Sequence, residues 1–182
     1  MTAELDKQLC DKYPLIFRDR NASKMVTAMC WGFPGDGWYW IIDHLCHKIQ
    51  RHIDTRAEDG KRNKEYNEMM ADAKAGDFTK FHEYFDFLAG DNLEIAKQDV
   101  LKGKPKEDPT VPQVIATQVK EKFGTLSFYV QAADDKVRAY IEFAEHLSAH
   151  MCEKCGATTG VTQVGTGASK TWIKTLCQNC NY

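Results

Sequence analysis

Four cysteines near the end of the chain constrain its fold more than any other feature. Cys152 and Cys155 form one CxxC pair, and Cys177 and Cys180 form another after 21 intervening residues. A two-residue gap lets the backbone curl so that both sulfurs face one point, and two such pairs supply the four thiolates of a tetrahedral Zn²⁺ site, with Zn–S distances of about 2.3 Å. We therefore predict one structural zinc ion per chain. The alternatives are a redox pair or disulfides, although a thioredoxin-like motif needs only one CxxC and a βαβ context.

The residues around the two pairs predict how they are presented. Residues 161–164 and 170–176 are β-rich and can pair across the glycine-containing segment 165–169. The order of knuckle, hairpin and knuckle is zinc-ribbon-like. Upstream, Asp134 is expected to cap a helix that leads into the first knuckle. The apolar residues expected to face inward from that helix are Val137, Tyr140, Ile141, Ala144 and Leu147.

Another β-hairpin is predicted before this helix, where the hydrophobic period changes from about 3.6 residues to about 2. Residues 114–120 and 125–131 form its strands, and residues 121–124 connect them, with Gly124 supplying the unusual backbone angle. One face of each strand is apolar, which is typical of an antiparallel pair with one buried face. The residues on those faces are Ile115, Thr117 and Val119, then Leu126, Phe128 and Val130.

The sequence before this hairpin is predicted to be mostly helical. A core-facing helix begins near Trp38, after an expected cap at Asp36, and its apolar residues recur at helical spacing to Ile53. Residues 54–64 are either a loop or the start of a further helix, and helical patterns end at Gly76, Gly90 and Gly103. The proline-rich, charged segment 104–112 reads as a linker. The prediction is an α+β protein with a helical part over 1–111 and a second part over 112–182.

Composition limits the classes of function and the compartment. The formal net charge is −2, and residues 112–182 carry seven basic against six acidic residues, a balance that is thin for a nucleic-acid-binding protein. No apolar run has the roughly 20 residues of a membrane helix, and the N-terminus lacks the features of a secretory signal. Cys10, Cys30 and Cys46 adjoin apolar residues, as expected for reduced thiols of a cytoplasmic protein.

Three stretches together resemble a family of small tailed-bacteriophage proteins of hypothetical function. They are GDGW at 35–38, QVKEKFGTLSFY at 118–129, and the CEKCG and WIKTLC segments that begin at 152 and 172. The similarity runs from about residue 9 to the end, with 54–111 outside it, and the family pattern has Arg where this chain has Ser127. The resemblance implies a phage accessory protein in the bacterial cytoplasm and assigns no activity.

The tip of the 114–131 hairpin is the first candidate ligand site. Lys120, Lys122 and Tyr129 are expected to lie near one another, with Phe123 at the turn. Two amines beside aromatic rings suit a phosphate-bearing planar ligand such as a signalling nucleotide. The alternative is that the lysines only solubilise the tip and that Phe123 is part of the core.

Tryptophans near the start of the long helix are candidate contacts for a protein partner. Trp31 and Trp40 are predicted as exposed anchors, since tryptophans buried on binding often dominate interface energies, while Trp38 fits the buried stripe. Core packing is the alternative for at least two of these aromatics. His44 and His47 are three residues apart, which permits a shared metal, but no thiol or carboxylate partner is near them in sequence and solvated surface is favoured.

No residues are assigned to catalysis. The sequence lacks a phosphate-binding glycine loop, a GxSxG elbow and an HExxH motif, and four cysteines leave no open position on the metal. His146 and His150 precede the first knuckle as in zinc-scaffolded nucleases, without a matching carboxylate. The prediction is a non-catalytic zinc-stabilised protein that binds a host or phage macromolecule, a protein rather than DNA. Nucleotide sequestration is the second hypothesis and a nuclease the third.

Overall fold

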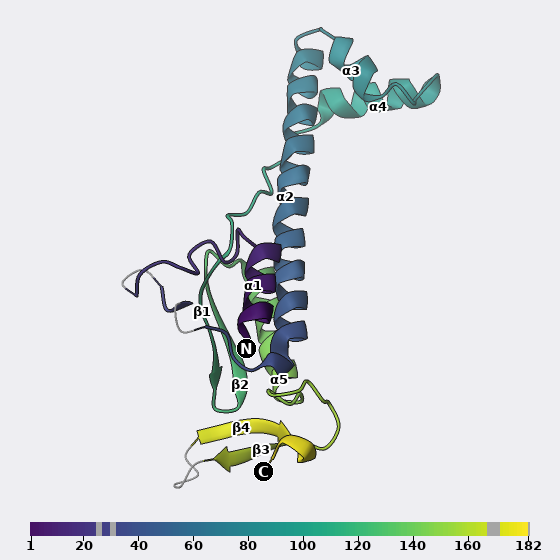
Figure 1. Ribbon diagram of the computed structural model, residues 1–182. Coiled ribbons are helices and arrows are strands. Elements are labelled where there is room, and N and C mark those ends of the chain that lie inside the picture. The colour runs from purple at the N-terminus through teal and green to yellow at the C-terminus, as the bar shows by residue number, and fades with distance from the viewer. Residues whose placement is uncertain (25–26, 30–31, 167–171, 182) are drawn as a thin grey trace. The chain divides into compact units, whose positions relative to one another are not determined.

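Helices and two antiparallel two-stranded sheets make up the described parts of the chain, in agreement with the predicted α+β class (Figure 1). The computed structural model describes residues 1–24, 27–29, 32–166 and 172–181. It divides into two units, Met1–His52 with Pro112–Tyr182, and Ile53–Val111. The division therefore differs from the predicted parts 1–111 and 112–182.

Backbone hydrogen bonds explain why the first 52 residues belong with the C-terminal part. The Ala116 N–H donates to the Ile16 carbonyl over 2.8 Å, and the Ala28 N–H donates to the Thr117 carbonyl over 2.9 Å. In both bonds, one partner lies in the N-terminal segment and the other lies in the first strand of the hairpin. The N-terminal segment is thus hydrogen-bonded to that strand, although the two are far apart in sequence.

Helix α2 (Tyr39–Lys74) follows the short 3₁₀ turn η2 (Asp36–Trp38) and contributes residues up to His52 to the first unit. Its buried stripe and Trp38 are as the sequence predicts. The buried residues of the stripe are Ile41, Ile42, Leu45, Cys46, Ile49 and Ile53. The expected cap is wrong, because Gly35 is the residue before the turn and the Asp36 carboxylate accepts from the Thr2 N–H, at the start of α1 (Ala3–Lys12).

The hairpin of β1 (Ile115–Lys122) and β2 (Thr125–Gln131) has a tighter turn than the predicted four-residue connection. Lys122 pairs with Thr125, and Phe123 and Gly124 have φ of 53° and 80°. Two positive φ values are those of a type I′ turn, which matches the twist of paired strands. A bulge between Ala116 and Gln118 shifts the register, so Ala116 is buried and the strict alternation predicted for β1 is broken.

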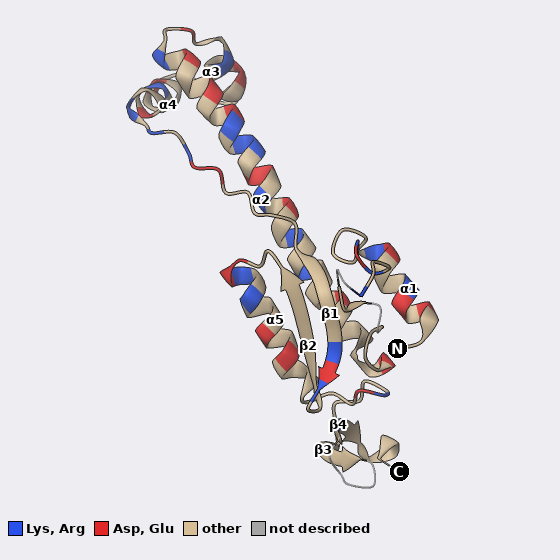
Figure 2. Ribbon diagram, turned by 90° about the vertical axis from the view of Figure 1, so that its left-hand side faces the viewer, with Lys and Arg blue, Asp and Glu red and all other residues tan. Residues whose placement is uncertain are grey.

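Helix α5 (Asp135–Ser148) packs along β2, as Figure 2 shows. Asp134 caps it as predicted, accepting from the Val137 N–H over 2.8 Å. Near its end, the Ser148 hydroxyl accepts from the Leu126 N–H over 2.8 Å, and the Glu145 carboxylate accepts from the Phe128 N–H over the same distance. These bonds fix the rotation of α5 against the hairpin.

The C-terminal ribbon consists of β3 (Val161–Thr166) and β4 (Trp172–Cys177), followed by the 3₁₀ turn η3 (Gln178–Cys180). The strands pair from Val161 with Cys177 to Thr166 with Trp172, and the rest of the predicted connection lies outside the described residues. The Thr175 hydroxyl donates to the Gly124 carbonyl. The turn of the β1–β2 hairpin therefore rests on the ribbon.

The second unit contains the rest of α2, α3 (Thr79–Tyr84) and α4 (Asp91–Lys102). Its core consists of Met69, Met70, Ala73, Phe81 and Val100. Residues 54–64 are helical, so the loop alternative is wrong, and the predicted helix over the aromatic stripe 78–88 is shortened to α3. None of the helices in the described ranges has both the length and the apolarity needed to cross a bilayer.

Segment 104–110 is bound to α2 within this second unit. The side-chain amide of Asn67 donates to the Lys106 carbonyl over 2.8 Å, and its oxygen accepts from the Lys106 N–H over 2.8 Å. A Cβ on Gly60 would lie 2.6 Å from Thr110 Cγ2. Glycine within the helix is therefore explained by the close approach of this segment, which the sequence reads as a linker.

Candidate metal centre

The two cysteine pairs are presented by different elements of the same unit. The first pair lies in a turn after α5, where the Gly156 N–H donates to the Cys152 carbonyl over 2.9 Å and Gly156 has a φ of 78°. The second pair lies at the end of β4 and in η3. The Cys152 N–H donates to the Ala157 carbonyl over 2.8 Å, which closes the first turn around its thiols.

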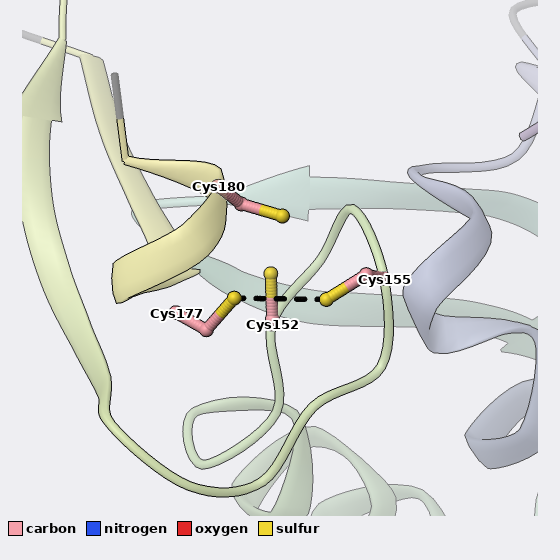
Figure 3. A group of neighbouring side chains, drawn as sticks. All are labelled: Cys152, Cys155, Cys177 and Cys180. Carbon is pink, nitrogen blue, oxygen red and sulfur yellow. Dashed lines mark hydrogen bonds between the residues drawn. The ribbon is translucent and has the colours of Figure 1, made fainter.

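The four sulfurs meet at one point, as predicted (Figure 3). All four Sγ atoms lie within 4.8 Å of one another, and those of Cys155 and Cys177 are 3.6 Å apart. A tetrahedron with metal–sulfur bonds of about 2.3 Å has sulfur–sulfur edges of about 3.8 Å. All four are free thiols, so the disulfide alternative does not describe this arrangement. The cluster can hold a metal ion.

The electrostatics of the cluster favour a thiolate at one position. Burial alone would raise the pKa of Cys152, but the backbone N–H groups of Cys177, Cys155 and Lys154 outweigh it and lower the pKa to about 6. Burial and the neighbouring thiols raise the pKa of Cys180 to about 12. Four thiols in contact resist losing all their protons together, and a bound cation removes that resistance because it deprotonates its thiol ligands.

Two lysines and a buried carboxylate flank the cluster. Lys154 Nζ donates to the Cys180 carbonyl over 3.1 Å, and Lys174 forms an ion pair with Glu153. The Glu153 side chain is buried, and its Oε2 has no hydrogen-bond partner among the described residues. A metal with four thiolates carries net negative charge, and the Lys154 ammonium beside the Cys180 carbonyl would offset part of it.

The first knuckle sits on the glycine turn before α2, a relation that sequence reasoning missed. The Gly37 N–H donates to the Glu153 carbonyl over 2.9 Å, and Trp38 Nε1 donates to the Met151 carbonyl over 3.0 Å. A Cβ on Gly37 would lie 2.0 Å from the Cys152 oxygen, and one on Gly35 would lie 2.1 Å from the Glu153 oxygen. The two glycines of the GxG sequence were a signal that another part of the backbone comes close, but nothing in the neighbouring sequence indicated that it is the first knuckle.

The hairpin-tip residues form two separate cation–aromatic pairs. Lys120 Nζ lies 5.3 Å from the centre of the Tyr129 ring, and Lys122 Nζ lies 5.7 Å from that of Phe123. Phe123 is 69% exposed, so it is not part of the core. Figure 2 shows basic and acidic residues side by side at this end of the hairpin, which weakens its electrostatic attraction for a polyanion. A ligand site at the tip stays a prediction.

Of the two tryptophans predicted to bind a partner, only one lies within the described residues. Trp40 is 64% exposed on the first turn of α2, while Trp31 lies outside the described residues. His44 Nδ1 is hydrogen-bonded to the Trp40 carbonyl over 2.8 Å, and neither His44 nor His47 belongs to a cluster of three or more metal-ligating groups among the described residues. Cys10 and Cys46 are free thiols, and Cys30 is another residue outside the described ranges.

An apolar groove beside Trp40 was not foreseen. It has a volume of about 500 Å³ and lies between α2 and α5. It is lined by Trp40, Ile41, His44, Leu45, Lys48, Tyr140, Phe143, Ala144, Leu147 and Met151. The expectation that Leu147 faces the core is wrong, because 41% of it is exposed, and Phe143 is 64% exposed. Their spacing of four residues was a sequence signal for a second apolar face on α5.

Comparisons with models of known families, with curated proteins and with solved structures find no match.

Proposed function

We propose that this chain is a non-catalytic, zinc-stabilised binding protein that engages a protein partner through the groove between α2 and α5. The carrying observation is the groove itself, with Trp40 and Phe143 each 64% exposed at its rim. Burial of large exposed aromatic side chains by a partner contributes strongly to the free energy of binding, and tryptophan is enriched among residues that dominate interface energies.

Zinc is the metal that the donor set favours. Four thiolates close enough to share one ion suit tetrahedral Zn²⁺, and such coordination would leave no position for a reactive water. Its proposed role is to fix the C-terminal ribbon and, through the Gly37 and Trp38 hydrogen bonds, the turn before α2. Elemental analysis of purified protein should find one zinc per chain.

The nature of the partner follows from charge and from the sequence resemblance. A formal net charge of −2 and the mixed charges at the hairpin tip favour a protein over a nucleic acid, whose binding depends on phosphate neutralisation by Lys and Arg. The resemblance to tailed-phage proteins supports an accessory role in the cytoplasm of an infected bacterium. The partner is then a host or phage protein.

Site-specific crosslinking tests this function. Trp40→p-benzoylphenylalanine places a photoreactive group at the groove, and the same replacement at Trp172 is a matched control at an exposed tryptophan of the C-terminal ribbon. Irradiation in an infected-cell extract should join one protein to position 40, with Phe143→Ser removing the product. Equal labelling from both positions, or labelling that Phe143→Ser leaves intact, contradicts the proposal.

A second candidate is nucleotide binding at the hairpin tip, favoured by the exposure of Phe123 and Tyr129 beside lysines. Rings that remain accessible to a base, next to ammonium groups for phosphate, are the elements that such a ligand needs. A panel of cyclic nucleotides should raise the melting temperature of the wild type and leave Lys122→Ala unchanged. Absence of any shift removes this candidate without affecting the first.

A further inference from the structure

Two hydrogen bonds, one near each end of the groove, fix α2 and α5 against each other. At one end, His52 Nε2 lies 2.8 Å from the Asp134 carboxylate, which also caps α5. At the other end, Trp38 Nε1 donates to the Met151 carbonyl over 3.0 Å. The turn before α2 is thus tied to the segment after α5, and His52 of α2 is tied to the residue that caps α5, so the two walls run antiparallel. A trough of this form exists before any partner binds.

The walls present side chains at helical spacing. Trp40, His44 and Lys48 recur every four residues along α2, and Phe143 and Leu147 do so along α5. Ile41, Leu45 and Ala144 also line the groove and are buried, so the furrow between the two rows can accept the apolar face of a third helix. The lining of the groove from Trp40 to Lys48 corresponds to about 12 Å of helix, which a partner helix of about eight residues would span.

The charge of the groove is one-sided. None of the described residues that line it is acidic, whereas Lys48 is exposed and lines it. Arg51 and Lys136 are exposed one turn further along the two helices, three residues after Lys48 and four before Tyr140. None of these three cations forms an ion pair with a described residue. Glu145 of α5 is turned away, because its carboxylate accepts from the Phe128 N–H.

We propose that the groove receives an acidic amphipathic helix of the partner protein, with its apolar face against Trp40, Phe143 and Leu147 and its carboxylates beside Lys48, Arg51 and Lys136. This inference rests on the proposed protein-binding function and names the chemistry of the partner. Cations with no ion-pair partner among the described residues attract carboxylates and repel basic helices, so charge selects the partner while apolar burial stabilises the complex.

Synthetic peptides test the inference on the full, metal-loaded chain. The probe is a fluorescein-labelled helix of about 16 residues with leucines along one face and glutamates elsewhere, long enough to cover the trough. One control replaces every glutamate by lysine, and another keeps the composition but scatters the leucines. Fluorescence anisotropy should show binding of the acidic amphipathic peptide, at least about tenfold weaker binding of the lysine peptide and none of the scattered one, with the difference shrinking in high salt.

Variants locate the binding. Phe143→Ser changes an exposed residue, so the fold should persist by circular dichroism while peptide binding is lost. Phe87→Ser, at another exposed phenylalanine, is the matched control and should bind normally. Lys48→Glu with Arg51→Glu should reverse the preference between the acidic and the lysine peptides. Equal or tighter binding of the lysine peptide by the wild type overturns the inference.

Two further outcomes separate this inference from the function on which it rests. If no peptide binds but position 40 still crosslinks to a partner through a Phe143-dependent contact, the acidic helix is refuted and the binding function stands. If crosslinking fails as well, the function falls too. Sedimentation that shows a concentration-dependent dimer, broken by Phe143→Ser, identifies a second copy as the occupant and also overturns the inference.

Discussion

Gly37→Ala is expected to disrupt the metal centre although Gly37 is not a ligand. The added Cβ would lie 2.0 Å from the Cys152 oxygen, 2.5 Å from the Gly156 nitrogen and 2.9 Å from the Cys155 nitrogen. All three are backbone atoms of the first knuckle, so no side-chain rotation relieves the overlap. Gly37 is not in the left-handed region, so the effect is steric and separate from backbone preference.

The magnitude follows from what must move. Overpacking a rigid site costs about 1–3 kcal/mol, and separation of the Gly37 N–H from the Glu153 carbonyl, which are 2.9 Å apart, adds about 1 kcal/mol. We expect urea denaturation to show a loss of about 2–4 kcal/mol in the free energy of unfolding. Because the knuckle carries two of the four sulfurs, competition with a chromophoric chelator should show metal affinity reduced by about 10- to 100-fold, as for other changes behind metal ligands.

Gly76→Ala is the matched control, since Gly76 has a φ of 97° but its Cβ would meet nothing within 4 Å. It should cost about 1 kcal/mol from the left-handed conformation and leave metal affinity unchanged. A Gly37→Ala protein that unfolds and binds metal like the wild type would refute the claim that the knuckle is seated on the glycine turn.

Three other perturbations have defined outcomes. Chelation of the metal, or Cys177→Ala, should unfold the C-terminal ribbon, seen as lost near-ultraviolet circular dichroism; unchanged melting would argue against a structural metal. Ser148→Ala should lower the free energy of unfolding by about 1–3 kcal/mol, because it leaves the buried Leu126 N–H without its acceptor, as urea titration can measure. Burial raises the pKa of Asp134, but the hydrogen bonds from His52 and from backbone N–H groups outweigh it and lower that pKa below 3.8. The ionised Asp134 carboxylate therefore stabilises the fold above pH 3.8, and this stabilisation is lost as pH falls through the folded pKa. Asp134→Asn should therefore flatten the acid limb of a stability–pH curve recorded below about pH 4.

Features encoded in short stretches of sequence were predictable. The two CxxC pairs specify knuckles through local spacing, and their meeting at one point needs only that the ribbon between them fold back. The buried stripe of α2 and the Asp134 cap of α5 are likewise set by residues within a few positions of one another. In each case the residues that determine the structure lie within the short sequence pattern that predicts it.

Features that depend on distant neighbours were not predictable. Gly35 and Gly37 look like loop glycines until the Glu153 and Cys152 carbonyls are placed against them. The first strand reads as alternating, but hydrogen bonds from Thr27 and Ala28 to the Thr117 carbonyl accompany a bulge that breaks the alternation. The spacing of Phe143 and Leu147 indicates a second apolar face on α5, but only the position of α2 shows that this face forms a groove wall.

Met151 links the metal centre to the groove. It immediately precedes the candidate ligand Cys152, and its carbonyl accepts a hydrogen bond from Trp38 Nε1. Met151 also lines the groove together with Trp40. Loss of the metal would release the knuckle, and with it the hydrogen bond that closes this end of the trough. A site built on exposed apolar side chains needs fixed walls, because each wall that must be ordered on binding subtracts from affinity. Under the proposed function, a metal held by the four cysteines would therefore serve recognition as well as folding, because it would keep the groove in the form that a partner meets.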